Sequence, residues 1–271
     1  MYYQEYTAPP VLNQYIKSFW TLEHDYSKPP MMDGERIWPD GHFEMIFTYD
    51  NPYYRILNGV RKQVPENFLI GQFNTELLLD SAGKTGLFAV RFHAWGLYPL
   101  LKHSLRTYTN KLTDLYFLFG NDIRKLKGSL STANREESIN RLSNFISERI
   151  SDFSPDGEVI IRIAREINDN LGNVQISSLM DKFQISERKI QKLFLEQVGI
   201  SAKHFAKIIR FREAKKLIER NPEVNLAALT YACGYSDQPH FIKNFKELFG
   251  ISPSQHKKRV IALSTYFEQH Q

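Results

Sequence analysis

The chain has 271 residues, of which 42% are hydrophobic and 24% are charged, and its formal net charge is +5. This is the composition of a globular protein and not of a disordered one, and the length suffices for two cores of ordinary size. The single cysteine excludes a disulfide framework and any zinc site built on several thiolates. We find no signal-peptide pattern at the start and no apolar run near the ~18–20 residues of a membrane span, so we expect a cytoplasmic protein without a membrane partner.

The positive charge is unevenly distributed along the chain. Residues 1–155 contain 17 Lys/Arg and 17 Asp/Glu, whereas residues 156–271 contain 18 and 13, so the second part carries the whole excess. A domain with this balance attracts polyanions through phosphate contacts and counterion release. Charge alone fits an ordinary solvated surface equally well, so the choice between the two depends on sequence motifs.

The first ~105 residues have the pattern of a β-rich domain. Short aromatic and β-branched runs recur between turn signals such as Pro39-Asp40-Gly41 and Asn58-Gly59. Runs of this kind predict a small barrel or sandwich, in which the many aromatic side chains either line a ligand cavity or fill a solid core. The predicted strands are 18–22, 42–49, 67–70, 76–79 and 86–93.

A helical period begins at Tyr98 and continues over 112–119. Asn134 or Thr132 is placed to cap a further helix, whose apolar residues recur at a spacing of three and four. Such a stripe packs on its own domain or forms a dimer seam, and the sequence leaves both open. We assign about 108–150 as a helical dimerisation segment of a domain spanning 1–150, which ends before the polar stretch 151–157. The stripe consists of Ile139, Leu142, Phe145, Ile146 and Ile150.

Residues 177–256 contain the same pattern twice. Ser177–Phe183 and Ser186–Phe194 are followed, about fifty residues later, by Leu226–Cys233 and Ser236–Phe245. Each copy closes on Gly-Ile-Ser, and the second copy has one extra residue after its serine. A duplicated helix-turn-helix unit, joined by one long helix over 202–219, is the economical interpretation.

Each copy has a helix with an apolar stripe on one face and polar side chains on the other. Ser186 and Ser236 are the expected N-caps, and Pro239 falls in the first turn, where its missing N–H is harmless. Arginine and lysine donate to guanine O6 and N7, and glutamine pairs with adenine, so such a face suits the DNA major groove. One face of this kind is usually only solvated surface, but two on one repeated motif favour DNA. The outward residues are Arg188, Gln191 and Lys192 in the first copy, and Gln238, Pro239 and Lys243 in the second.

Residues 157–258 resemble the DNA-binding domain of the AraC/XylS family of bacterial transcription regulators. The resemblance rests on Arg210–Ala214 in the connector, Ala232–Gln238 and Lys246–Pro253. It implies seven helices, two homeodomain-like helix-turn-helix units and promoter binding. Met180 stands where the family usually has alanine and His256 where it usually has tyrosine, which affects packing more than groove contacts. The DNA-binding residues assigned by position are Ser186, Arg188, Lys189, Gln191, Lys192, Ser236, Gln238, Pro239, His240 and Lys243.

The N-terminal part is similar to a group of regulator sensor domains, often with a cupin-like β fold, through Arg36–His42, Glu44–Phe47 and Val90–Phe92. No effector follows from this resemblance. Because cupin-like barrels often bind metal through histidine and carboxylate, His42, Glu44 and His93 raise the alternative of a metal-dependent enzyme tethered to DNA. We expect structural roles for these three residues, with no metal and no cofactor.

We expect no enzymatic activity. Cys233 lies where a small buried residue is wanted, whereas a reactive cysteine needs an exposed, activated thiolate. No nucleophile elbow, phosphate-binding glycine loop or two-histidine zinc motif occurs in the sequence. The sequence therefore predicts an α+β chain of two domains: a small β-barrel, cupin-like domain with helices over 1–150, and an all-α double helix-turn-helix domain over 156–260, followed by a tail over 261–271.

The predicted function is that of a sequence-specific DNA-binding transcription regulator, controlled by a ligand or by dimerisation through its N-terminal domain. The expected partners are double-stranded operator DNA, a small-molecule effector, a second copy in a homodimer, and RNA polymerase. A further alternative is a regulator whose N-terminal domain binds a protein partner in place of a small molecule. A solid N-terminal core would favour that alternative.

Overall fold

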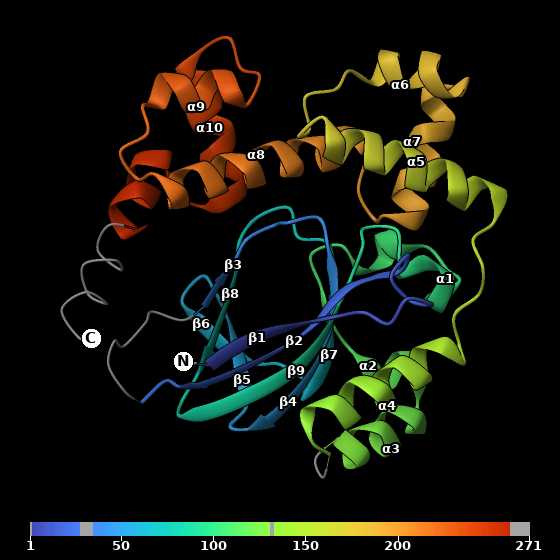
Figure 1. The fold of residues 1–271 in the computed structure, drawn as a ribbon. Helices are drawn as coiled ribbons and strands as arrows, with labels where there is room; N and C mark the ends of the chain where they lie inside the picture. Colours follow the sequence, from blue (N-terminus) through green and yellow to red (C-terminus); the bar gives the residue numbers. More distant parts are fainter. Residues whose placement is uncertain (1, 28–34, 131–132, 261–271) are drawn as a thin grey trace.

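The computed structural model describes residues 2–27, 35–130 and 133–260. Thr132, one of the two expected caps, and the predicted tail over 261–271 lie outside the described residues. The chain forms a β-rich N-terminal part, with a helical C-terminal part lying across one end of it (Figure 1). Within the described residues, no helix is both long and apolar enough to cross a membrane.

The N-terminal part is built on two antiparallel sheets. The six-stranded sheet has the order β1-β2-β9-β4-β7-β10, and the four-stranded sheet has the order β3-β8-β5-β6. Apolar side chains from both sheets, among them Ile46, Phe68 and Leu79, form the core between them. The strands are β1 (Tyr2–Thr7), β2 (Ile16–Asp25), β3 (Glu35–Ile37), β4 (Phe43–Asp50), β5 (Tyr53–Leu57), β6 (Val60–Gln63), β7 (Asn67–Ile70), β8 (Leu77–Ser81), β9 (Lys84–Phe92) and β10 (Leu112–Asp114).

Strand β4 is a continuous buried run because both of its faces are covered. Phe43, Met45 and Phe47 point toward the helices of the N-terminal part, whereas Ile46 points into the core between the sheets. Since successive side chains of a strand point to opposite faces, an uninterrupted apolar run is what such a central strand requires. The side chains of β4 and its neighbour β9 therefore contribute to two hydrophobic cores, one on each face of the sheet.

All five predicted strands are present, but five others were missed. β1 and β6 are almost entirely exposed, so they lack the buried alternation that marks a strand. The helical prediction over 112–119 is wrong at its start, because Leu112 lies in β10 and pairs with Ile70 of β7. The helix begins three residues later, after Asp114 caps it by accepting a hydrogen bond from the Tyr116 N–H.

The N-terminal part also contains helices that cover one face of the six-stranded sheet. Leu142, Phe145 and Ile146 of the predicted stripe are buried in this core, so the stripe packs within its own chain. Asn134 caps the helix in a capping box with Glu137. These elements are α1 (Tyr98–Leu101), the 3-10 turn η1 (Leu105–Tyr108), α2 (Leu115–Phe119), α3 (Asn121–Leu130) and α4 (Arg135–Ser147).

The C-terminal part is all-helical and has one apolar core. α8 is the predicted connector, and its 19 residues span about 28 Å at 1.5 Å per residue. Figure 1 shows α6 and α7 near one end of α8, and α9 and α10 near the other. The helices are α5 (Pro155–Asp169), α6 (Ile176–Phe183), α7 (Glu187–Gln197), α8 (Ala202–Arg220), α9 (Leu226–Ala232) and α10 (Gln238–Phe249), and residues 253–260 are also helical.

Candidate nucleic-acid interface

The first helix-turn-helix unit consists of α6 and α7. The chain turns at Gln184, whose φ is 50°, and Ser186 caps α7 by accepting a hydrogen bond from the Lys189 N–H at 3.3 Å. Ile190, Leu193 and Phe194 of α7 are buried in the core. The sequence predicted that this face of α7 would be buried, and its burial leaves the opposite face of the helix toward solvent.

The outward face of α7 holds the residues predicted to contact DNA. Arg188, Gln191 and Lys192 are exposed, and none of them forms a hydrogen bond or ion pair with another described residue. Lys189 is also exposed, but its Nζ lies 2.9 Å from Asp156 Oδ1. Ser186 is exposed at the start of the helix. The structure thus leaves three of these side chains unengaged, while Lys189 has a carboxylate partner.

The second unit consists of α9 and α10, and its N-cap differs from the prediction. The cap is Asp237 and not Ser236, because the Asp237 carboxylate accepts a hydrogen bond from the His240 N–H at 2.9 Å. The second copy has one extra residue after its serine, and the aspartate that follows Ser236 is an equally good cap. Pro239 lies in the first turn, as predicted.

The outward face of α10 is exposed, like that of α7. Ser236, Gln238, Pro239, His240 and Lys243 are all solvent-exposed, whereas the stripe Phe241, Phe245, Leu248 and Phe249 is buried. The His240 ring lies against Tyr235, with ring centroids 5.1 Å apart. The two units therefore present their predicted faces from opposite ends of one connector helix.

Cys233 is buried at the end of α9. Burial raises the pKa of its thiol to about 12, although the Arg210 charge acts in the opposite direction. A thiol in this state is protonated at neutral pH and is a poor nucleophile. The residue fills the small buried position that the sequence predicted.

The N-terminal part touches both units at equivalent positions of the repeat. Gly199 and Gly250, which follow the two outward helices, both have positive φ. The Thr109 hydroxyl donates a hydrogen bond to the Gly199 carbonyl at 2.7 Å, and a Cβ on Gly250 would overlap the Glu76 carboxylate. Contact at matching points of both units ties the orientation of each to the N-terminal part.

A loop of the N-terminal part, residues 38–42, lies against α8 and the second unit. The Trp38 ring lies 5.8 Å from the Phe249 ring and 4.9 Å from the His256 ring, measured between centroids. Gly41 has a φ of +84°, and a Cβ there would be 2.9 Å from the Phe205 ring of α8. The stretch that carries the resemblance to sensor domains is thus an interdomain contact. This role could not be predicted from a local pattern, because Phe205 of α8 lies 164 residues after Gly41.

Beside this loop, a groove of about 400 Å³ separates the two parts. Lys17, Arg165 and Arg212 line it, and Asp169 is the one carboxylate among its lining residues. Burial lowers the pKa of Lys17, and the charges of Arg212 and Arg91 lower it further. The sequence did not predict this cationic groove, since its residues come from β2, α5 and α8.

The three metal candidates have other partners. Glu44 lies 2.6 Å from the Arg91 guanidinium, and His93 Nε2 lies 3.2 Å from the Asn13 carbonyl. His42 is within 3.1 Å of Lys17 Nζ, and burial lowers its pKa to about 3. Among the described residues, no group of three or more His, Cys, Asp or Glu is arranged to hold a metal ion.

The space inside the β-rich part is small. The cavity next to His42, Glu44 and Arg91 measures about 40 Å³. A water molecule needs about 10–15 Å³ of such space, so this volume suits a few waters and not an organic effector. The aromatic side chains fill a core and do not line a ligand cavity at this place.

Known proteins match each part of the chain separately. Residues 179–259 match the family described as a helix-turn-helix domain, and residues 4–114 match a domain of unknown function, DUF6597. The HTH-type transcriptional activator RhaR of Yersinia pseudotuberculosis serotype O:3 is 31% identical over 108 residues, covering 40% of this chain and 37% of its own. The Msm operon regulatory protein of Streptococcus mutans is 27% identical over 100 residues, covering 36% of each chain.

The matched region is thus little more than a third of the length of these curated relatives. A solved structure, ToxT from Vibrio cholerae O395, aligns with 90% of this chain and 98% of its own, at 14% identity and a TM-score of 0.48. The duplicated units, their caps and their glycine turns agree with the family match. Residues 179–259 therefore form a helix-turn-helix domain of the AraC type.

Proposed function

We propose that the whole chain is a sequence-specific DNA-binding transcription regulator that works in the cytoplasm and carries out no enzymatic step. The observation that carries the proposal is the pair of exposed faces on α7 and α10, one in each copy of the motif. Arg188, Gln191 and Lys192 have no competing partner in the described chain. Charged and amide side chains left free on a helix are suited to read base edges.

The length of α8 supports reading by both units at once. Its span of about 28 Å is close to the ~34 Å between successive major grooves on one side of the double helix. Each unit would place its outward helix in one groove. A single chain would then bind double-stranded operator DNA at two adjacent positions.

We further propose that the N-terminal part controls how the two units are presented. It contacts both Gly199 and Gly250, so a shift of the N-terminal part changes the orientation of one unit relative to the other. An effector that binds one arrangement better than another would shift the population toward it. The same proposal includes homodimerisation and contact with RNA polymerase. Leu142, Phe145 and Ile146 of the α4 stripe are buried within the chain, so a dimer contact of the segment 108–150 would use its other side chains.

We place a small effector in the groove between the two parts, where cationic side chains lie beside apolar ones such as Trp95 and Ile209. Three cations against one carboxylate favour an anionic molecule. Such a ligand would raise the thermal midpoint of the full chain by mass action. A thermal-shift screen of carboxylates and phosphates tests this, with Lys17→Gln as the variant that should lose the shift and Lys125→Gln, on α3, as the control.

The regulatory proposal is tested by selecting genomic fragments bound by the full chain. We expect a common sequence element among them, and affinity that falls steeply with salt as phosphate contacts release counterions. Fragments without a common element, or affinity that is independent of salt, would overturn the proposal.

A further inference from the structure

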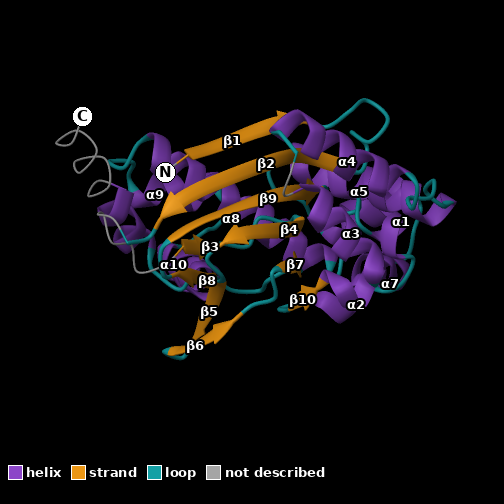
Figure 2. Ribbon diagram, turned by 90° about the horizontal axis from the view of Figure 1, so that it is seen from below, coloured by secondary structure: helices purple, strands orange, loops and turns teal. Residues whose placement is uncertain are grey.

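The two sheets of the N-terminal part leave one side open. β10 is the last strand of the six-stranded sheet and β6 is the last strand of the four-stranded sheet, and the two do not pair with each other. Figure 2 shows their ends facing the same gap. Unpaired strand edges carry free backbone N–H and C=O groups, which natural proteins cover or block.

The direction of these backbone groups follows from the neighbouring ladders. The Val64 N–H donates to the Tyr53 carbonyl, so alternation directs the backbone groups of Arg61 and Gln63 away from β5. The Gly71 N–H donates to the Lys111 carbonyl, which by the same rule directs Leu112 away from β7. Both edges therefore present hydrogen-bonding groups to the gap.

Between the edges lies a groove of about 640 Å³, within the ~300–1,000 Å³ range of ligand clefts. Apolar groups form part of its wall: Val64 is buried, and Leu112 packs against the core between the sheets. At its border stands Phe117, which is 82% exposed. No other large apolar side chain in the described part of the chain is as exposed. Phe117, Val64 and Leu112 thus give the groove an apolar part on which an apolar side chain of a partner can pack.

The groove is cationic. Arg55, Lys62 and Lys111 line it, and none of the three forms an ion pair with another described residue. Asp114 is the one carboxylate among its lining residues, and it is engaged in capping α2. The guanidinium of Arg55 covers the Phe73 ring at 5.3 Å. The groove thus carries more positive than negative charge.

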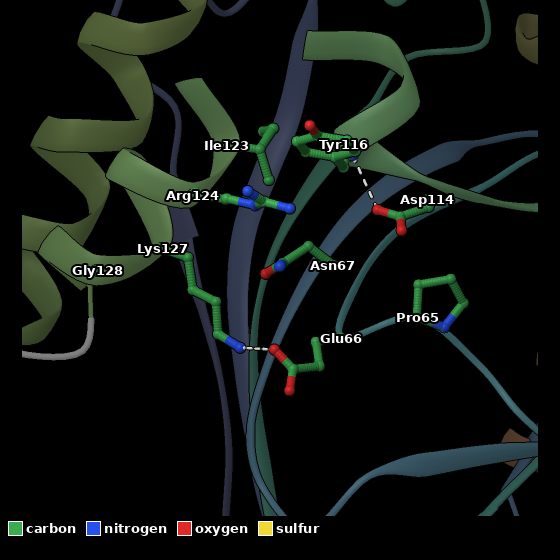
Figure 3. Close-up of a pocket in the computed structure, with 9 residues that line it drawn as sticks. All are labelled: Pro65, Glu66, Asn67, Asp114, Tyr116, Ile123, Arg124, Lys127 and Gly128. Carbon is green, nitrogen blue, oxygen red and sulfur yellow. Dashed lines mark hydrogen bonds and ion pairs between the residues drawn. The ribbon is translucent and has the colours of Figure 1, made fainter. Parts of the chain in front are cut away.

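A second groove of about 520 Å³ continues past α2 and shares Pro65 and Asp114 with the first. Figure 3 shows Arg124 and Lys127 reaching toward it from α3, with Lys127 paired to Glu66. The two grooves therefore adjoin at Pro65 and Asp114.

We propose that this seam, bounded by β6 and β10, binds an extended acidic segment of a partner protein. The segment adds a strand to the β6 edge, places its carboxylates near Arg55, Lys62 and Lys111, and sets an apolar side chain on Phe117. Strand addition supplies backbone hydrogen bonds, while alternate side chains supply specificity. The unpaired strand edges fit a peptide better than a nucleic acid, because only a polypeptide can add a strand to the sheet.

The test starts with displayed random peptides of about a dozen residues, a length of roughly 40 Å when extended. They are selected on the full chain, and the enriched peptides are then synthesised with a fluorescent label. We expect peptides in which acidic and apolar residues alternate. Their affinity, measured by anisotropy, should fall at least tenfold for Lys62→Glu and for Phe117→Ser.

The matched control is Lys125→Glu, the same charge change on the exposed side of α3, which should leave affinity unchanged. Amide hydrogen exchange on the wild-type chain should slow at Arg61 and Gln63 when the peptide binds. The proposal is overturned if selection enriches no peptide, if Lys62→Glu and Lys125→Glu weaken binding equally, or if these amides are not protected. Operator binding by the same variants is measured in parallel and should not change, so failure here is distinct from failure of the DNA-binding proposal.

Discussion

At the residue scale, substitution of the unpaired side chains on α7 distinguishes recognition of DNA bases from nonspecific attraction to phosphate. Lys192 and Arg188 form no hydrogen bond or ion pair in the described chain, so their substitution removes none. We predict that Lys192→Ala or Arg188→Ala weakens specific operator binding by about 1–3 kcal/mol and relaxes preference at one base pair. Titrations against the selected site and its single-base variants check this. If both variants keep the same affinity and the same base preference, α7 does not lie in the major groove as assigned.

A glycine in the helical part shows how backbone geometry limits substitution. Gly172 has a φ of +79°, and a Cβ there would overlap the Ala206 carbonyl oxygen of α8. Gly59 has a φ of +75° but nothing within 4 Å of a Cβ, so it serves as the control for conformation alone.

We predict that Gly59→Ala costs about 1–2 kcal/mol from the left-handed conformation, and that Gly172→Ala costs at least about 1 kcal/mol more, since it also displaces a backbone. Urea denaturation of both variants measures the free energy of unfolding. Equal losses of unfolding free energy in the two variants would show that the α8 backbone moves away from the new Cβ without an energetic cost.

At the element scale, the loop 38–42 connects the β-rich part to α8 and α10. Trp38 is half-buried against Phe249 and His256, and Lys215 Nζ lies 4.9 Å from its ring centroid. We predict that Trp38→Ala destabilises the chain by about 2–3 kcal/mol, below the 3–5 kcal/mol of a fully buried aromatic residue. In the Trp38→Ala variant, the backbone amide hydrogens of residues 245–256 should exchange faster with solvent. Exchange that is unchanged there would show that the loop does not hold the second unit.

The elements also show where sequence patterns suffice. The α7 and α10 faces could be predicted because helical periodicity and caps are local, and the one error, the cap at Ser236, was a displacement by one residue. β4 and β9 were predicted because their apolar runs are long. β1 and β6 were missed because they are exposed, and β10 because its three residues continue into an apolar helix. The interdomain role of Trp38 depends on packing between distant segments, which no local pattern encodes.

At the scale of the whole molecule, several histidines couple stability to pH. Burial lowers the pKa of His42 to about 3 and that of His256 to about 4, and it also lowers the pKa of His93 and His204. At neutral pH each is therefore uncharged in the folded chain, whereas in the unfolded chain each takes up a proton near pH 6.5. Their contribution to stability is therefore complete above pH 6.5 and is lost progressively as the pH falls toward the folded values.

We predict that the free energy of unfolding falls between pH 7 and pH 5, and that His256→Phe reduces this slope. His256 Nε2 has no hydrogen-bond partner among the described residues, so phenylalanine leaves no partner unsatisfied. Urea denaturation across this range measures the slope. A slope that is the same in the variant would contradict the assignment of His256 as a neutral buried group.

The central claim is that both helix-turn-helix units of one chain read DNA together. The most direct measurement is hydroxyl-radical footprinting and methylation interference of the full chain on its selected operator. We expect protection on one side of the double helix, with interference at bases in two major grooves about 34 Å apart. We also expect that Lys192→Ala affects one groove and Lys243→Ala the other. Interference confined to a single groove, or protection without any preference for base sequence, would contradict this claim.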